Sequence, residues 1–215
     1  KKGDPLGSFT SIIGLADLVT NTPDAQLLPA LINTVELDHW LYDWAVQVGT
    51  ANSDIVGNNW YAIKPAEPGS KWLLRTFDFT HAFGCTGSIG PGNNTACQLY
   101  NTDPYMFYNK WQQRCYQIPE FENRFLVILN DVLTNYLTVE KFNSLLEEAY
   151  DRTQIDRQDE ILLGYGGPAP YVMDAGDYAN IKTYFASRRT WLLNTWLAGK
   201  TYTPPANHHP TISLS

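Results

Sequence analysis

Residues 52–84 read NSDIVGNNWYAIKPAEPGSKWLLRTFDFTHAFG, and this stretch decides the fold around it. Two short apolar runs, WYAI at 60–63 and KWLLRT at 71–76, are separated by the turn-forming sequence PAEPGS at 65–70. Short apolar runs on either side of a Pro/Gly turn predict a β-hairpin. Because a hairpin returns the chain to its starting point, the residues before the first run and after the second are expected to meet.

Three oxygen-bearing side chains flank this predicted hairpin. Asp54 and Asn59 precede it, and Asp78 follows it between two phenylalanines. Carboxylate and amide oxygens are the ligands that Mg²⁺ and Mn²⁺ prefer. The order D-x₄-N, hairpin, D-F also matches the catalytic loop of a protein kinase followed by its metal-binding loop. In that chemistry Asp54 orients the attacking hydroxyl, and Asn59 and Asp78 hold the metal that neutralises the phosphates.

The same residues allow a purely structural interpretation. Asp54 can cap an Asx-turn, Asn59 can be an ordinary turn residue, and Asp78 can accept hydrogen bonds at the end of a strand. A carbohydrate-active module, with Asp54 and Asp78 as its carboxylate pair, is a further alternative.

A longer set of segments resembles the spore-coat-protein-H (CotH) kinase family of secreted, protein-kinase-like proteins. The segments are LDHWLYDW at 37–44, GNNW at 57–60, KWL at 71–73, FDFTHAFG at 77–84 and LND at 129–131. The resemblance covers most of residues 30–190. It implies that Asp54 is the catalytic acid, that Asn59 and Asp78 bind metal and the nucleotide, and that the protein uses ATP with Mg²⁺ or Mn²⁺. The implied acceptor is a hydroxyl of a coat or cell-surface protein.

One position departs from the family pattern. Members often carry a second Asp two residues after the first in the Asp-Phe loop, where this chain has Thr80. That difference supports an alternative of another class, a catalytically inactive secreted or cell-surface binding or adhesion protein with the same fold.

The predicted fold class is mainly α with a β-hairpin (α+β), like the C-terminal lobe of an atypical protein kinase. We expect one domain over residues 1–200, with the catalytic and metal loops at 52–84, a cysteine-containing loop at 85–118 and a helical subdomain at 119–199. A Pro-rich tail or linker follows at 201–215. A kinase also needs a strand-rich lobe with a phosphate-pairing lysine. Nothing before Ser8 could build one, so we expect either a missing N-terminal segment of the same protein, which fits better, or a protein without a complete ATP site.

Apolar periodicity predicts helices over about 7–21, from 22 onward, 35–49, 119–136, from 138 onward, 153–163 and 177–198. Pro29 is expected to interrupt the second helix early. The Trp40 and Trp44 pair is expected to be core. Arg188 and Arg189 are expected on a solvated helix face.

The cysteines favour an oxidising compartment. Cys85 and Cys97 bracket a turn-rich loop and are predicted to form a disulfide, with Cys115 free or paired to a segment outside this chain. Asn93 begins an N-x-T glycosylation sequence. Together these features predict a secreted, extracellular or cell-surface protein.

Composition excludes other classes. The net charge of −7 argues against a surface for nucleic acid or anionic membrane, which would need a basic patch. No apolar run is long enough for a membrane span.

Overall fold

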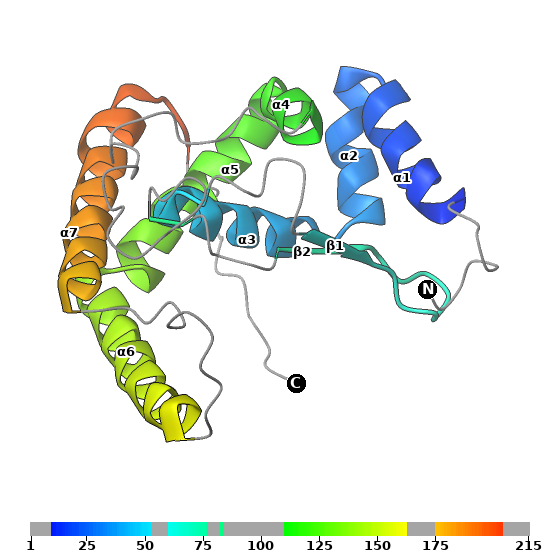
Figure 1. Cartoon of the computed structure of the whole chain (residues 1–215). Coiled ribbons are helices and arrows are strands. Elements are labelled where there is room, and N and C mark those ends of the chain that lie inside the picture. The colour runs from blue at the N-terminus through cyan, green and yellow to red at the C-terminus, as the bar shows by residue number, and fades with distance from the viewer. Residues whose placement is uncertain (1–9, 53–59, 77–81, 84–109, 163–174, 204–215) are drawn as a thin grey trace.

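The computed structural model describes residues 10–52, 60–76, 82–83, 110–162 and 175–203. These residues form helices joined to one small sheet, which confirms the predicted class, mainly α with a hairpin (Figure 1). The likeness to a kinase lobe stays a prediction. In chain order the main elements are α1 (Thr10–Asn21), α2 (Asp24–Thr34), α3 (Leu37–Thr50), β1 (Trp60–Ile63), β2 (Leu73–Thr76), α4 (Lys110–Tyr116), α5 (Pro119–Asp131), α6 (Val139–Leu162) and α7 (Ala175–Trp191).

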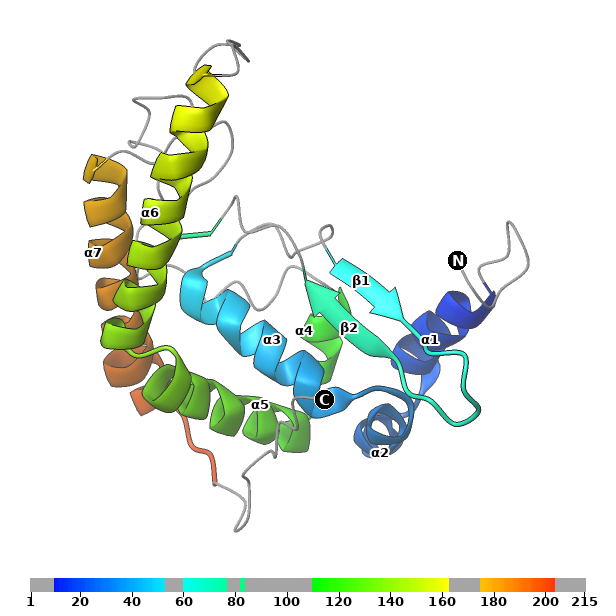
Figure 2. The same cartoon turned by 90° about the horizontal axis from the view of Figure 1, so that it is seen from below.

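Helix α3 lies at the centre of the molecule (Figure 2). It packs on α5 along its length, on β2 at its middle and on α7 near its C-terminal end. Helices α6 and α7 lie side by side at that end, whereas α1 and α2 lie at the opposite end beside the hairpin. The C-terminal end of α3, from which residues 53–59 continue, therefore points toward the α6–α7 pair.

The hairpin forms where the sequence predicts it. Strands β1 and β2 are antiparallel, with Trp60 opposite Thr76 and Ile63 opposite Leu73. The residue before β2, Trp72, also pairs with Val35 in the link between α2 and α3. This pairing fixes the hairpin against the start of α3.

The main core surrounds the tryptophan pair of α3. Trp44 is 1% exposed, and its ring centroid lies 4.3 Å from that of Phe125 on α5. Trp40 stacks on Trp44 at 5.9 Å. Both tryptophans are core, as predicted, because they occur one helical turn apart on the face that α5 covers. A second, smaller cluster joins α6 to α7 through Phe142, Leu146 and Phe185.

Some helix predictions were wrong. Helix α2 continues through Pro29 to Thr34. Pro29 and Ala25, whose carbonyl loses its usual partner there, are both exposed, so water can satisfy that carbonyl. Residues 110–116, predicted as loop, form α4.

The helix predicted over 153–163 is the second half of α6, which has no Gly or Pro to break it. Its salt bridge between Arg152 and Glu148 is an i,i+4 pair that supports the helix at that point.

Candidate functional site

The three predicted site residues Asp54, Asn59 and Asp78 lie outside the described residues. The structure does describe residues that lie close to these three in the sequence. Asn59 directly precedes Trp60, and Asp78 comes two residues after Thr76. Trp60 and Thr76 are partners in the hairpin register. We call this end of the hairpin the loop end, and the end at 64–72 the turn end.

A buried polar chain fastens the loop end to α3. Thr76 donates its backbone N–H to Asp43 Oδ2 at 3.2 Å and its hydroxyl to the same oxygen at 2.8 Å. The Gln47 amide donates to Thr76 Oγ1, and Asn52 Nδ2 donates to Gln47 Oε1 at 2.8 Å. Gln47 and Asn52 are both 0% exposed. Buried polar groups are retained only where their partners are supplied, so this chain of contacts sets one geometry for the loop end.

A backbone contact adds a second fastening. The N–H of Phe83 donates to the carbonyl of Thr50 at 2.6 Å. Phe83 also packs on Phe142 of α6 at 5.4 Å between ring centroids. The chain just beyond residues 77–81 is therefore held to the helix that leads into residues 53–59.

Two residues near residues 53–59 and 77–81 adopt left-handed backbone conformations. Ala51 has φ of 52° and Phe83 has φ of 58°. Residues with a Cβ pay roughly 1–2 kcal/mol for that region, and such residues gather at functional sites. Ala51 ends α3 and turns the chain into residues 53–59; Phe83 follows residues 77–81.

The prediction that Arg188 and Arg189 form a solvated face is wrong. Arg188 is 0% exposed, and its Nε donates to the carbonyl of Val48 near the C-terminal end of α3 at 3.3 Å. Arg189 Nε donates to the carbonyl of Leu133 at 2.8 Å. Carbonyls near the C-terminal end of a helix carry partial negative charge and attract cations. Local sequence patterns could not predict these contacts, because the acceptors lie 140 and 56 residues away along the chain.

Asp43 is the one acid of this polar chain. Burial raises the pKa of its carboxyl group, and the hydrogen bonds from Thr76 and the nearby His39 and Arg75 oppose that rise. Burial also lowers the pKa of His39, helped by Arg75 and opposed by Asp43 and Glu36. His39 is therefore neutral near pH 7.

The predicted disulfide and glycosylation sites stay predictions. Cys85, Cys97 and Asn93 lie outside the described residues. Cys115 is free and fully buried, and its predicted pairing to a segment outside this chain stays a prediction. Burial raises the pKa of its thiol to about 12, so it is protonated and unreactive near neutral pH.

The described residues contain no other candidate metal centre. Within 10–52, 60–76, 82–83, 110–162 and 175–203, no three His, Cys, Asp or Glu side chains gather in a way that could hold a metal ion. None of the helices in those ranges is long and apolar enough to cross a membrane.

Sequence reasoning missed a recess beside the hairpin, which lies between α3 and α4. Its walls come from α3, both strands of the hairpin and α4. The lining residues are Trp40, Asp43, Trp60, Leu74, Arg75, Thr76, Trp111 and Gln112.

Comparison with protein families identifies the class. The family model described as CotH kinase protein matches residues 5–192, so the chain belongs to the CotH kinase family. This match confirms the resemblance drawn from the sequence. No curated protein and no solved structure matches the chain.

Proposed function

We propose that this protein transfers the γ-phosphoryl group of ATP to a hydroxyl group of a protein at a coat or cell surface. Asp54 orients the attacking hydroxyl, and Asn59 and Asp78 hold Mg²⁺ or Mn²⁺ on the phosphates. Family membership supports kinase-like chemistry. The positions of the three residues in the family pattern support their roles.

The observation that carries the proposal is the register of the hairpin. Trp60 is opposite Thr76, so the chain that carries Asn59 and the chain that carries Asp78 begin from neighbouring points. Consecutive Cα atoms are about 3.8 Å apart, so residues one or two positions away have limited reach. Two ligands of one metal must meet within a few ångströms, and this register favours that meeting.

The fastening of α3 supports the role of Asp54. Asn52, the last described residue before it, is hydrogen-bonded to Gln47, which also bonds Thr76. One amide thus links the chain before Asp54 to the chain before Asp78. Catalytic groups need such a rigid supporting structure, because misplacement by about 1 Å can cost 100-fold in rate.

Nucleotide binding and phosphoryl transfer test the two acids separately. ATP binding is titrated by calorimetry with and without MnCl₂, and transfer is followed with γ-³²P-labelled ATP on a mixed Ser/Thr/Tyr polypeptide. Asp78→Ala is expected to abolish metal-dependent ATP binding, because it removes a ligand. Asp54→Asn is expected to keep ATP binding and lose transfer. Asp17→Ala, on the exposed surface of α1, is the matched control.

Two results would contradict these roles. Full ATP and Mn²⁺ binding by Asp78→Ala would show that Asp78 is not a metal ligand. Transfer at the normal rate by Asp54→Asn would show that Asp54 is not the catalytic acid. Nucleotide binding without any transfer by the unaltered protein would favour the inactive binding protein that Thr80 suggests.

We also propose that the protein is secreted and carries a Cys85–Cys97 disulfide. The spacing of the two cysteines and the glycosylation sequence at Asn93 support this. Intact mass of the alkylated protein tests it: only prior reduction should let Cys85 and Cys97 take up alkyl groups. Alkylation of both without reduction would contradict the disulfide.

A further inference from the structure

The recess between α3, the hairpin and α4 contains a polar group that lacks a partner. Gln112 is 6% exposed, and its side chain lines the recess. Its Oε1 atom accepts no hydrogen bond from any residue within the described ranges. A buried acceptor left without a donor costs about 1–3 kcal/mol. Because Oε1 is itself buried, the Gln112 side chain must turn toward the recess for a donor that enters there to recover that cost.

The charge and the aromatic faces of the recess favour a cation. Asp43 supplies a carboxyl group. Trp40, Trp60 and Trp111 supply indole rings, and the last two have centroids 5.8 Å apart. The faces of indole rings attract cations within about 6 Å of the centroid.

The neighbouring basic residues Arg75 and His39 do not neutralise the carboxyl group of Asp43. Arg75 also lines the recess, but it is exposed and, among the described residues, forms no ion pair with Asp43. His39 is neutral near pH 7 because burial lowers its pKa. Within the described part of the chain, the carboxyl of Asp43 is therefore bonded to Thr76 without a cation in contact.

The size of the recess limits what can enter. Its volume is about 30 Å³. A single water needs roughly 10–15 Å³, so the space holds an ammonium group and the carbon attached to it.

We propose that this recess binds a primary ammonium group, which donates hydrogen bonds to Asp43 and to Gln112 Oε1 with its attached carbon against the tryptophans. A lysine side chain of another protein and a free alkylamine carry this same group. The proposed contacts use none of Asp54, Asn59 and Asp78, although the recess shares Asp43, Trp60 and Thr76 with the loop end.

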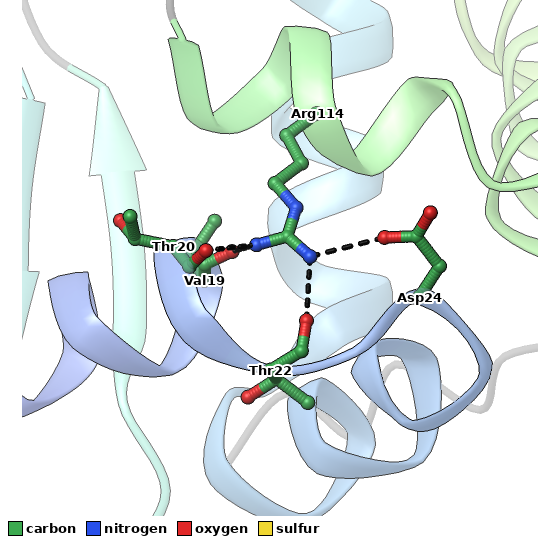
Figure 3. Close-up of polar contacts among 5 residues, drawn as sticks. All are labelled: Val19, Thr20, Thr22, Asp24 and Arg114. Carbon is green, nitrogen blue, oxygen red and sulfur yellow. Dashed lines mark hydrogen bonds and ion pairs between the residues drawn. The ribbon is translucent and has the colours of Figure 1, made fainter.

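A separate cluster of hydrogen bonds holds α4 in place and so preforms the recess. Arg114, two residues after Gln112, reaches from α4 to the turn between α1 and α2 (Figure 3). Its guanidinium donates to the carbonyls of Val19, Thr20 and Thr22, and it forms a salt bridge with Asp24 at 3.0 Å. A rigid support of this kind reduces the ordering cost of binding.

Titration with propylammonium chloride, followed by ¹⁵N NMR of the indole N–H groups, tests the proposal. The Trp60 and Trp111 signals are expected to shift in a saturable way, whereas Trp196, outside the recess, should not. Propan-1-ol, which has similar size and no charge, should bind about tenfold more weakly or not at all.

Matched variants locate the binding groups. Asp43→Asn is expected to weaken binding about tenfold or more, and Gln112→Met about threefold or more, since each loses one hydrogen bond to the cation. Asp17→Asn and the exposed neighbour Gln113→Met should bind as the unaltered protein does. Equal binding of propan-1-ol, no saturable shift, or unchanged binding by Asp43→Asn would each overturn the proposal.

A second titration identifies the source of the group. Acetyl-Gly-Lys-Gly-amide presents the ammonium group on a peptide backbone. Tighter binding of this peptide than of propylammonium would assign the site to a protein lysine. Weaker binding would assign it to a small amine.

Discussion

The two ends of the β1–β2 hairpin differ in how they are held. At the loop end, Thr76 bonds Asp43 and Gln47, and Gln47 bonds Asn52. At the turn end, residues 64–69 are exposed. Buried polar side chains bond the end that leads to Asp78, whereas Trp72 at the turn end is bonded to the α2–α3 link through its backbone. Burying polar groups is costly unless they are paired, so this difference indicates that the loop end is the part whose geometry matters.

The largest effect in this comparison is expected for Gln47→Leu. The substitution removes the donor to Thr76 and the acceptor of Asn52 from a fully buried position. We expect the free energy of unfolding to fall by about 2–4 kcal/mol. Urea denaturation measures this. A loss below about 0.5 kcal/mol, the range of ordinary surface substitutions, would show that the polar chain does not fasten the loop end.

Thr76→Val should have a smaller effect, since it keeps the shape of the side chain and the backbone N–H bond to Asp43. It removes the hydroxyl that bonds both Asp43 and Gln47. The expected loss is about 1–2 kcal/mol in the same denaturation experiment. Thr183→Val, at an exposed position on α7, is the matched control. Equal losses for the two variants would contradict a special role for Thr76.

Gly69→Ala tests the turn end, where the loss of stability should come from backbone strain alone. Gly69 has φ of +82°, and nothing lies within 4 Å of a Cβ built there. We expect a loss of about 1 kcal/mol in stability. The same substitution should leave ATP binding and transfer unchanged. A change in either would contradict the separation between the two ends.

Asp43→Asn should have the smallest effect, and that effect should depend on pH. Because burial raises the pKa of Asp43, the folded state holds its proton more tightly than the unfolded state does. Stability therefore falls as the pH rises from the ordinary Asp pKa, 3.8, through the raised pKa, and is level above it.

The Asn variant cannot ionise, so its stability relative to the unaltered protein should rise across that same pH interval. Thermal unfolding at a series of pH values measures the difference, with Asp17→Asn as the control. A difference that is constant with pH would show that the pKa of Asp43 is not raised.

Local sequence patterns predicted most of the helices and the hairpin. Contacts between residues far apart in the chain could not be predicted from such patterns. The hairpin and the buried Trp40–Trp44 pair followed from a Pro/Gly turn and from helical spacing. Gln47 and Arg188 were not predicted as buried, because a polar residue in a helix normally indicates the solvent face. Their partners, Thr76 and Val48, lie 29 and 140 residues away.

The predicted hairpin is present, and the predicted site residues lie outside the described residues. The sequence predicted that Asp54 and Asn59, before the hairpin, would meet Asp78, after it. The pairing of Trp60 with Thr76 confirms the hairpin on which that prediction rests. The positions and roles of the Asp54, Asn59 and Asp78 side chains stay predictions. The recess could not be foreseen, because Gln112 lies in a segment that was predicted as loop.

Mn²⁺ itself provides the most direct test of the central claim, that the metal and nucleotide bind at the loop end. Bound Mn²⁺ broadens NMR signals of nearby nuclei, and the broadening falls steeply with distance. With ATP present, the amide signals of Trp60 and Thr76 should broaden while that of Gly69 stays sharp. Asp78→Ala should abolish the difference. Equal broadening at both ends, or broadening that Asp78→Ala leaves unchanged, would contradict the account.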